Sequence, residues 1–256
     1  MKLLLINPSV AAENFEPEYL RINPNGTVPS LLIPFEDKIL TDTREILEFL
    51  DRYSNSVKSP SLNPSDAETI LAVNSLIELV HSSELDTNLI LLAPRNETEL
   101  EAKKSGMWND FVANRQAALE RLHSAEPENP FYSAKVKENG ALSRLYTAKP
   151  DREHDIFFKD TEAKYRKFAA AMDDLNAQLR LPYAAGNQVT LADLHIVPWL
   201  SHALAGVGTT DPSDFSKFDA HIQQTVPGFH VGRNIRAWWK NFSERDSFKE
   251  VFKELH

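Results

Sequence analysis

The pattern of apolar and polar positions divides the chain into a short part with strands and a long helical part. Short apolar runs bounded by turn residues predict strands, whereas apolar residues at a spacing of three and four predict helices. The elements predicted for the first part are strands at 2–6, 30–34 and 38–41, a helical turn at 17–20 and a helix at 43–53. The predicted fold class is therefore α+β, with the strands in the first part and helices in the second.

The second part contains helix signals almost throughout. Residues 65–68 read Ser-Asp-Ala-Glu, a capping box that opens a helix with a broad apolar face. Asn96 with Glu99 predicts the cap of another helix, which runs through Leu122. A polar, proline-punctuated stretch follows to about residue 157. Helices then return, and we expect this part to be entirely α-helical.

Residues 54–64 separate the two parts and are rich in Ser, Asn and Pro, as is typical of a linker. We therefore expect domains at 1–53 and 65–256. Near the C-terminus, aromatic residues recur at near-helical spacing, and this stripe favours a packed core rather than a ligand site. Its members are Ile235, Trp238, Trp239, Phe242, Phe248, Val251 and Phe252.

The charge, the lack of cysteine and the short apolar segments of the chain argue against several classes of function. The 28 basic and 37 acidic side chains give a net charge of −9, and no run of Lys or Arg is present, which disfavours nucleic-acid binding. The chain has no cysteine, which excludes disulfides, thiolate metal sites and a cysteine nucleophile. No segment reaches about 18 uncharged apolar residues, the length of a membrane span. We expect a soluble, cytoplasmic protein.

Two motif blocks on either side of the predicted hairpin carry specific chemistry. The first is Asn-Pro-Asn-Gly-Thr-Val-Pro at 23–29. Its Pro24 and Gly26 favour a tight turn, because one fixes φ and the other frees it. The second block is Asp42-Thr43, at the start of the following helix. Together the two blocks resemble the glutathione-binding half of the glutathione transferases.

This resemblance implies a binding site and names its residues. In the family the proline after Val is cis, so Val28 and Pro29 would pair with the cysteinyl backbone of glutathione like an added strand. Asp42 and Thr43 stand where the family has Glu or Gln followed by Ser, and they would hold the γ-glutamyl end. The alternative stays open that Pro29 serves the fold alone and that Asp42 or Thr43 is an ordinary helix cap.

A third block, residues 186–193, matches the family motif Gly-x-x-x-Ser/Thr-x-Ala-Asp. We expect this motif to stabilise the fold rather than to take part in chemistry, because Thr190 and Asp193 have the spacing of a capping box at a buried helix. His195 and His202 follow on one helical face. Because no third ligand lies at a suitable spacing, we interpret them as helix histidines and expect no metal site.

The catalytic group is not identified by the resemblance. Family members have a further strand and helix before the equivalent of residues 2–6, so the resemblance implies an incomplete thioredoxin-like first domain. Either the first strand pairs directly with residues 30–34, or the structure departs locally from the family. Whether the N-terminus is native or truncated stays open. Ser9 is a candidate catalytic hydroxyl, with a turn residue as the alternative. Tyr19 is nearest in sequence, but we expect its ring to pack.

Between the helix that opens at Ser65 and the helix at 161–179, the family needs only a short connection. This chain has an insertion at about 94–158, which resembles that of the ganglioside-induced differentiation-associated proteins and their dehalogenase-like relatives. The animal proteins of that group end in a membrane anchor, and we expect none in this protein.

The leading hypothesis is a homodimeric transferase that binds glutathione as co-substrate at Val28, Pro29, Asp42 and Thr43. A small hydrophobic electrophile would bind beside the helix that opens at Ser65, and the reaction would be conjugation, glutathione removal or isomerisation. Two alternatives remain. One is a glutathione-independent enzyme for a small hydrophobic molecule on the same scaffold, and the other is a non-catalytic binding or assembly module.

Overall fold

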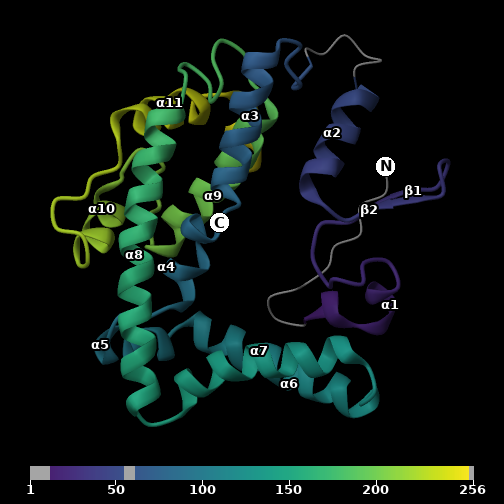
Figure 1. The fold of residues 1–256 in the computed structure, drawn as a ribbon, viewed down its shortest axis with the longest axis vertical. Helices are drawn as coiled ribbons and strands as arrows, with labels where there is room; N and C mark the ends of the chain where they lie inside the picture. The colour runs from purple at the N-terminus through teal and green to yellow at the C-terminus, as the bar shows by residue number, and fades with distance from the viewer. Residues whose placement is uncertain (1–11, 55–60, 254–256) are drawn as a thin grey trace. The chain divides into compact units, whose positions relative to one another are not determined.

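The computed structural model describes residues 12–54 and 61–253 of the chain (Figure 1). These residues form two compact units. In the first, the described residues up to Leu47 pack with Pro94–Phe157, and in the second, Glu48–Ala93 packs with the described residues from Phe158 onward. The strand predicted at 2–6, most of the linker and Ser9 lie outside the described residues. The division into 1–53, 54–64 and 65–256 stays a prediction.

A two-stranded hairpin is the only sheet among the described residues. β1 (Leu31–Ile33) and β2 (Lys38–Leu40) are antiparallel, with Leu31 opposite Leu40. Ile33 and Leu40 are buried while the other face of the hairpin is exposed, as alternation along a half-buried strand requires. The predicted strands at 30–34 and 38–41 are confirmed, each slightly shorter than expected.

Short helical turns precede the hairpin and a long helix follows it. η1 (Glu13–Phe15) and α1 (Pro17–Leu20) come first, and α1 coincides with the predicted helical turn. α2 (Thr43–Ser54) begins where the helix was predicted to begin. The α+β prediction is therefore confirmed.

The predicted helix from Asn96 through Leu122 is wrong as a single element. The structure has α5 (Glu97–Lys104) and α6 (Met107–Ala125), with a break at Gly106, whose backbone is extended with φ −118° and ψ −178°. Glycine loses more conformational freedom in a helix than any other residue, so an interior glycine favours such a break. The cap at Asn96 is confirmed, because its side chain accepts a hydrogen bond from the Glu99 backbone N–H at 2.9 Å.

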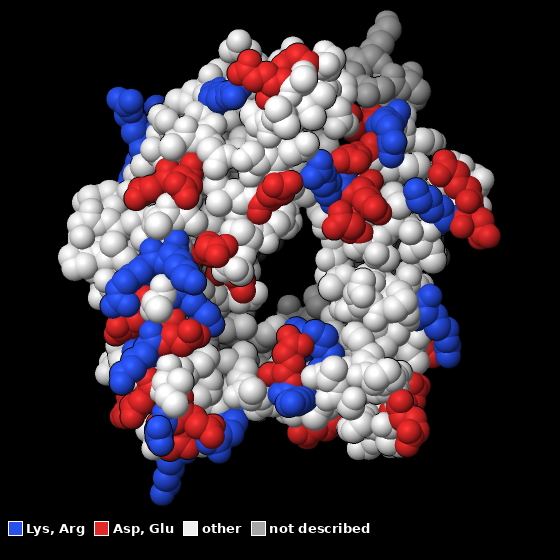
Figure 2. Space-filling model, in the orientation of Figure 1, with Lys and Arg blue, Asp and Glu red and all other residues white. Residues whose placement is uncertain are grey.

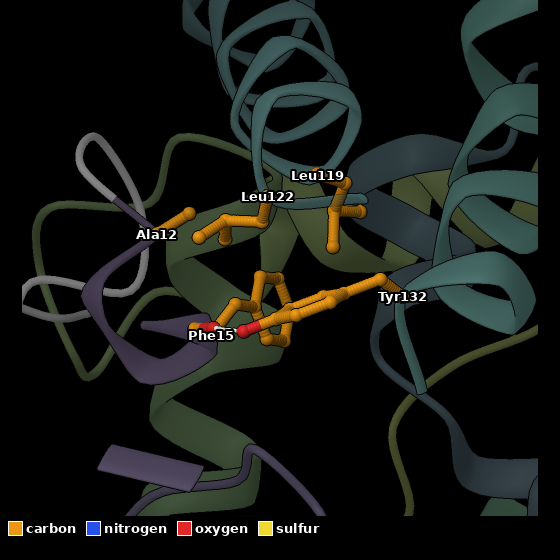
Figure 3. Close-up of a cluster of buried hydrophobic side chains, with 5 residues drawn as sticks. All are labelled: Ala12, Phe15, Leu119, Leu122 and Tyr132. Carbon is orange, nitrogen blue, oxygen red and sulfur yellow. Dashed lines mark hydrogen bonds between the residues drawn. The ribbon is translucent and has the colours of Figure 1, made fainter. Parts of the chain in front are cut away.

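A further helix, α7 (Pro130–Thr147), occupies most of the stretch that was predicted only as polar and proline-punctuated. The Asn129 side chain caps it by accepting from the Phe131 N–H at 3.1 Å, and Pro130 stands at its first position, where a missing N–H costs nothing. α6 and α7 pack together. Figure 3 shows the core that they form with η1, made of Ala12, Phe15, Leu119, Leu122 and Tyr132.

The second unit is helical in all its described regular elements apart from one isolated β-bridge between Tyr183 and Gly186. The predicted cap at Ser65 is wrong by one residue: Asp66 caps the first helix, accepting from the Thr69 N–H at 2.8 Å. The C-terminal aromatic stripe is core as predicted, except that Phe252 is only half-buried and Val251 is exposed. The helices are α3 (Ala67–Val80), η2 (Ser83–Leu85), α4 (Asn88–Leu92), α8 (Arg152–Gln178), α9 (Leu191–Gly206), α10 (Ser216–Gln223), α11 (Arg233–Ser243) and α12 (Asp246–Val251).

Acidic and basic side chains are interspersed on the face drawn in Figure 2. Along α8, for example, Lys164 pairs with Asp160 and Arg166 with Glu162, each four residues apart. Such exposed pairs contribute little to stability and keep a helix face solvated. None of the helices in the described ranges is long and apolar enough to cross a membrane.

Candidate functional site

The open end of the β1–β2 hairpin brings the four predicted binding residues to one place. Leu31 lies opposite Leu40 in the register. Pro29 comes two residues before Leu31, and Asp42 comes two residues after Leu40. The Val28–Pro29 segment and the Asp42–Thr43 tip of α2 therefore leave the same end of the hairpin.

The segment Asn23–Ser30, which we call the binding loop, contains Val28, whose backbone bonds to no other described residue. The Val28–Pro29 peptide bond is cis, as the resemblance led us to expect. The Val28 side chain is 45% exposed, and no hydrogen bond with another described residue uses its backbone N–H or C=O. Both groups are therefore available to an extended peptide, which would add to this segment as a strand adds to a sheet edge.

The tip of α2 is capped by its own acid. One carboxylate oxygen of Asp42 accepts from the backbone N–H of Arg44 at 2.9 Å and from that of Glu45 at 3.1 Å. Asp42 is thus a helix N-cap, and these two N–H groups are no longer free for a ligand. Its second oxygen makes no hydrogen bond with a described residue, and the same holds for the N–H and hydroxyl of Thr43. Asp42 is exposed and Thr43 half-buried.

Buried polar side chains hold the binding loop by hydrogen bonds to its backbone. The sequence patterns did not predict them. Asn23 is fully buried, and its amide group donates to the Thr27 carbonyl at 2.7 Å and contacts the Thr27 hydroxyl at 2.9 Å. Its carbonyl oxygen accepts from the Asn25 N–H at 3.0 Å, an Asx turn. The Asn-Pro-Asn-Gly string is typical of such a turn, and that signal could have identified Asn23.

Tyr19 also holds the binding loop. Its ring is buried, as expected, and its hydroxyl donates to the Thr27 carbonyl at 2.6 Å and lies 3.0 Å from the Ser30 hydroxyl. The phenol therefore holds the two residues that flank the Val28–Pro29 segment. Ser9, the other candidate hydroxyl, lies outside the described residues, and its catalytic role stays a prediction.

The third motif has the structural role that its spacing predicted. Thr190 caps α9, and its backbone N–H donates to the Asp193 carboxylate at 2.8 Å, which confirms the capping box. His195 lies 2.8 Å from a ring nitrogen of His81, and His202 lies 2.8 Å from the Thr87 hydroxyl. Each is therefore hydrogen-bonded within the helical unit. Among the described residues, no group of three potential ligands could hold a metal ion.

Comparisons with known proteins found one family model and several solved structures that are similar to this chain. A family model described as the N-terminal domain of glutathione S-transferase matches residues 5–52, which include the binding loop and the tip of α2. The crystal structure of the beta-etherase LigF from Sphingobium sp. strain SYK-6 aligns with 98% of this chain and 87% of its own at 17% identity, with a TM-score of 0.55. Gtt2 from Saccharomyces cerevisiae aligns with 96% of this chain and 84% of its own at 18% identity, with a TM-score of 0.48. No curated protein sequence matches the chain.

The described residues combine a cis-proline loop beside a two-stranded hairpin with a chain that is otherwise mostly helical. The LigF similarity shows a shared fold, and the family match covers the segment that carries the loop. Residues 5–52 thus match the N-terminal domain of glutathione S-transferase.

Proposed function

We propose that this protein binds glutathione at the open end of the β1–β2 hairpin. One observation carries the proposal: Val28, Asp42 and Thr43 leave the same end of the hairpin. Among the described residues, none bonds to the Val28 backbone N–H and C=O, to the second Asp42 oxygen or to the Thr43 N–H and hydroxyl. A tripeptide with an anionic, a cationic and an extended amide portion offers a partner for each.

The roles of the residues follow from their chemistry. The N–H and C=O of Val28 would pair with the cysteinyl backbone. The N–H and hydroxyl of Thr43, at the positive end of a helix, would hold the γ-glutamyl carboxylate. The free oxygen of Asp42 would accept from the γ-glutamyl ammonium, a charge-assisted hydrogen bond.

We further propose that the second substrate is a small hydrophobic electrophile. In conjugation, the glutathione sulfur attacks an electrophilic carbon of the substrate, the leaving group departs from that carbon, and the thiol proton passes to solvent. In removal of glutathione, the bound thiol would attack the sulfur of a glutathione thioether, so that glutathione disulfide leaves and the released carbon takes up a proton. In isomerisation, the same thiol would add to the substrate and be released unchanged. Cytoplasmic location and a homodimer, which are common in the superfamily, complete the proposal.

Isothermal titration of the full chain with glutathione tests the binding site directly. Asp42→Asn removes the charge but keeps a side chain that caps helices well. Since hydrogen bonds to charged groups contribute about 1.5–3 kcal/mol, we expect at least about tenfold weaker binding for Asp42→Asn, and weaker binding for Thr43→Val.

Asp66→Asn is the matched control, because Asp66 makes the same N-cap bond at α3 without belonging to the site. Its affinity for glutathione should equal that of the wild type. Equal affinity in the wild type and in Asp42→Asn would contradict the proposed role of Asp42.

Turnover of a chlorinated nitrobenzene with glutathione would then distinguish a transferase from a binding protein.

A further inference from the structure

We propose that the α6–α7 pair positions the binding loop, with Phe131 as the residue that sets the loop's path. This inference rests on the proposed function and extends it. It assigns the helices of the inserted segment a role in ligand affinity, through contacts made entirely within the first compact unit.

The first contact is at Gly26, in the middle of the binding loop. Its φ of +62° is one that residues with a side chain rarely adopt. A Cβ atom placed there would lie 2.8 Å from Cζ of Phe131 and 3.0 Å from Cδ1 of Phe15. The loop backbone therefore runs directly against both rings, and no space separates them. The Asn14 side chain fixes the same point by donating to the Gly26 carbonyl at 2.6 Å.

The second contact holds Phe15 itself in place. The hydroxyl of Tyr132, which is fully buried, donates to the Phe15 carbonyl at 2.8 Å (Figure 3). The ring of Phe15 lies 5.8 Å from that of Phe131, and the Arg115 guanidinium on α6 stands 4.7 Å from the Phe15 ring centre. Residues of both α6 and α7 thus fix the ring on which the loop rests.

A shift of either ring moves the loop at Gly26, two residues before Val28. Because Val28 would pair with the ligand through its backbone, a displacement of the chain there changes the pairing directly. Phe131 is accordingly a positioning residue: it touches the loop and not the ligand. The side chain of Phe131 is only half-buried, so the fold tolerates changes that the loop does not.

Two substitutions at Phe131 disturb the contact in opposite senses. Phe131→Ala removes the support, whereas Phe131→Tyr adds an oxygen at Cζ, the atom nearest to Gly26. We expect each to weaken glutathione binding by about fivefold or more, measured by isothermal titration at a temperature where circular dichroism shows folded protein. Leu100→Ala is the control, because Leu100 is fully buried on α5 outside the cluster that contains Phe15. It should lower the melting temperature and leave the affinity within about twofold.

A second readout separates this inference from the proposed function. Amide exchange and chemical shifts of Thr27 and Val28 in the ligand-free protein should change in both Phe131 variants and stay unchanged in Leu100→Ala. If the wild type fails to bind glutathione but these amides respond, the proposed function is wrong and the positioning role stands. If the wild type binds and the Phe131 variants match it in affinity and in these amides, the positioning role is wrong.

Discussion

At the scale of single residues, one carboxylate joins three segments of the helical unit. Asp193 is fully buried and accepts from the backbone N–H of Thr190 and of Ala184 and from the indole N–H of Trp238, each at 2.8 Å. The Thr190 hydroxyl adds a bond at 3.1 Å. A buried charge is stable only when hydrogen bonds replace its lost hydration, and here they do.

Asp193→Ala should therefore cost far more than the loss of an ordinary cap. Several buried donors would be left without an acceptor, at about 1–3 kcal/mol each, so we expect a loss of at least about 3 kcal/mol in unfolding free energy. Urea unfolding of the two proteins measures it. Asp66→Ala, at an exposed cap, should lose much less stability than Asp193→Ala, and a similar loss for both variants would disprove this account.

Local spacing predicted the bond between Thr190 and Asp193 because both residues lie within one helical turn. The bonds to Ala184 and Trp238 come from residues 9 and 45 positions away, and no local pattern contains them. Tyr19 shows the same limit: burial of its ring could be predicted, whereas the bonds of its hydroxyl depend on how the binding loop folds.

At the scale of elements, strong local signals predicted the hairpin, α1, α2 and the caps at Asn96 and Thr190. Two errors concern where helices begin and end: one helix boundary was missed at Gly106 and one at Asn129-Pro130. Gly106 breaks the helix after α5, although apolar spacing continues across it. Asn129 is a helix cap and Pro130 stands at the first helical position, which together signal the start of a helix. Because the proline was interpreted as a helix breaker, α7 was not predicted.

A buried acid also ties α2 to the segment that follows it. Asp51 accepts from the Leu62 N–H at 2.9 Å, from the Ser61 hydroxyl at 2.9 Å and from the Asn63 amide at 2.8 Å. The Leu62 carbonyl in turn accepts from the Leu191 N–H at 3.2 Å. Burial by itself would raise the pKa of Asp51, but these hydrogen bonds outweigh it and hold the pKa below its ordinary value of 3.8.

The sign of this pKa shift gives a pH dependence. Because the folded state favours the ionised form, Asp51 stabilises the fold above pH 3.8, and this contribution is lost as pH falls through the lower folded pKa. At pH 7, Asp51→Asn should lower the unfolding free energy by about 1–2 kcal/mol, measured with urea. The difference from the wild type should shrink as pH falls below 4, and a difference that stayed constant would contradict this role.

At the scale of the whole molecule, the candidate site lies within one of the two compact units. That unit combines the N-terminal hairpin and binding loop with helices from residues 94–157, far apart in sequence. The motifs predicted the residues at the hairpin end. They could not predict that Phe131 and Tyr132 support the loop, because this depends on packing between residues about 105 positions or more apart in the sequence.

The central claim is that glutathione binds across the open end of the hairpin, and an NMR titration of the ¹⁵N-labelled full chain tests it most directly. We predict that glutathione shifts the amide resonances of Val28 and Thr43, while those of Thr190 and Asp193 in the helical unit stay in place. Saturating shifts confined to other residues, or no shifts at all at millimolar glutathione, would contradict the claim.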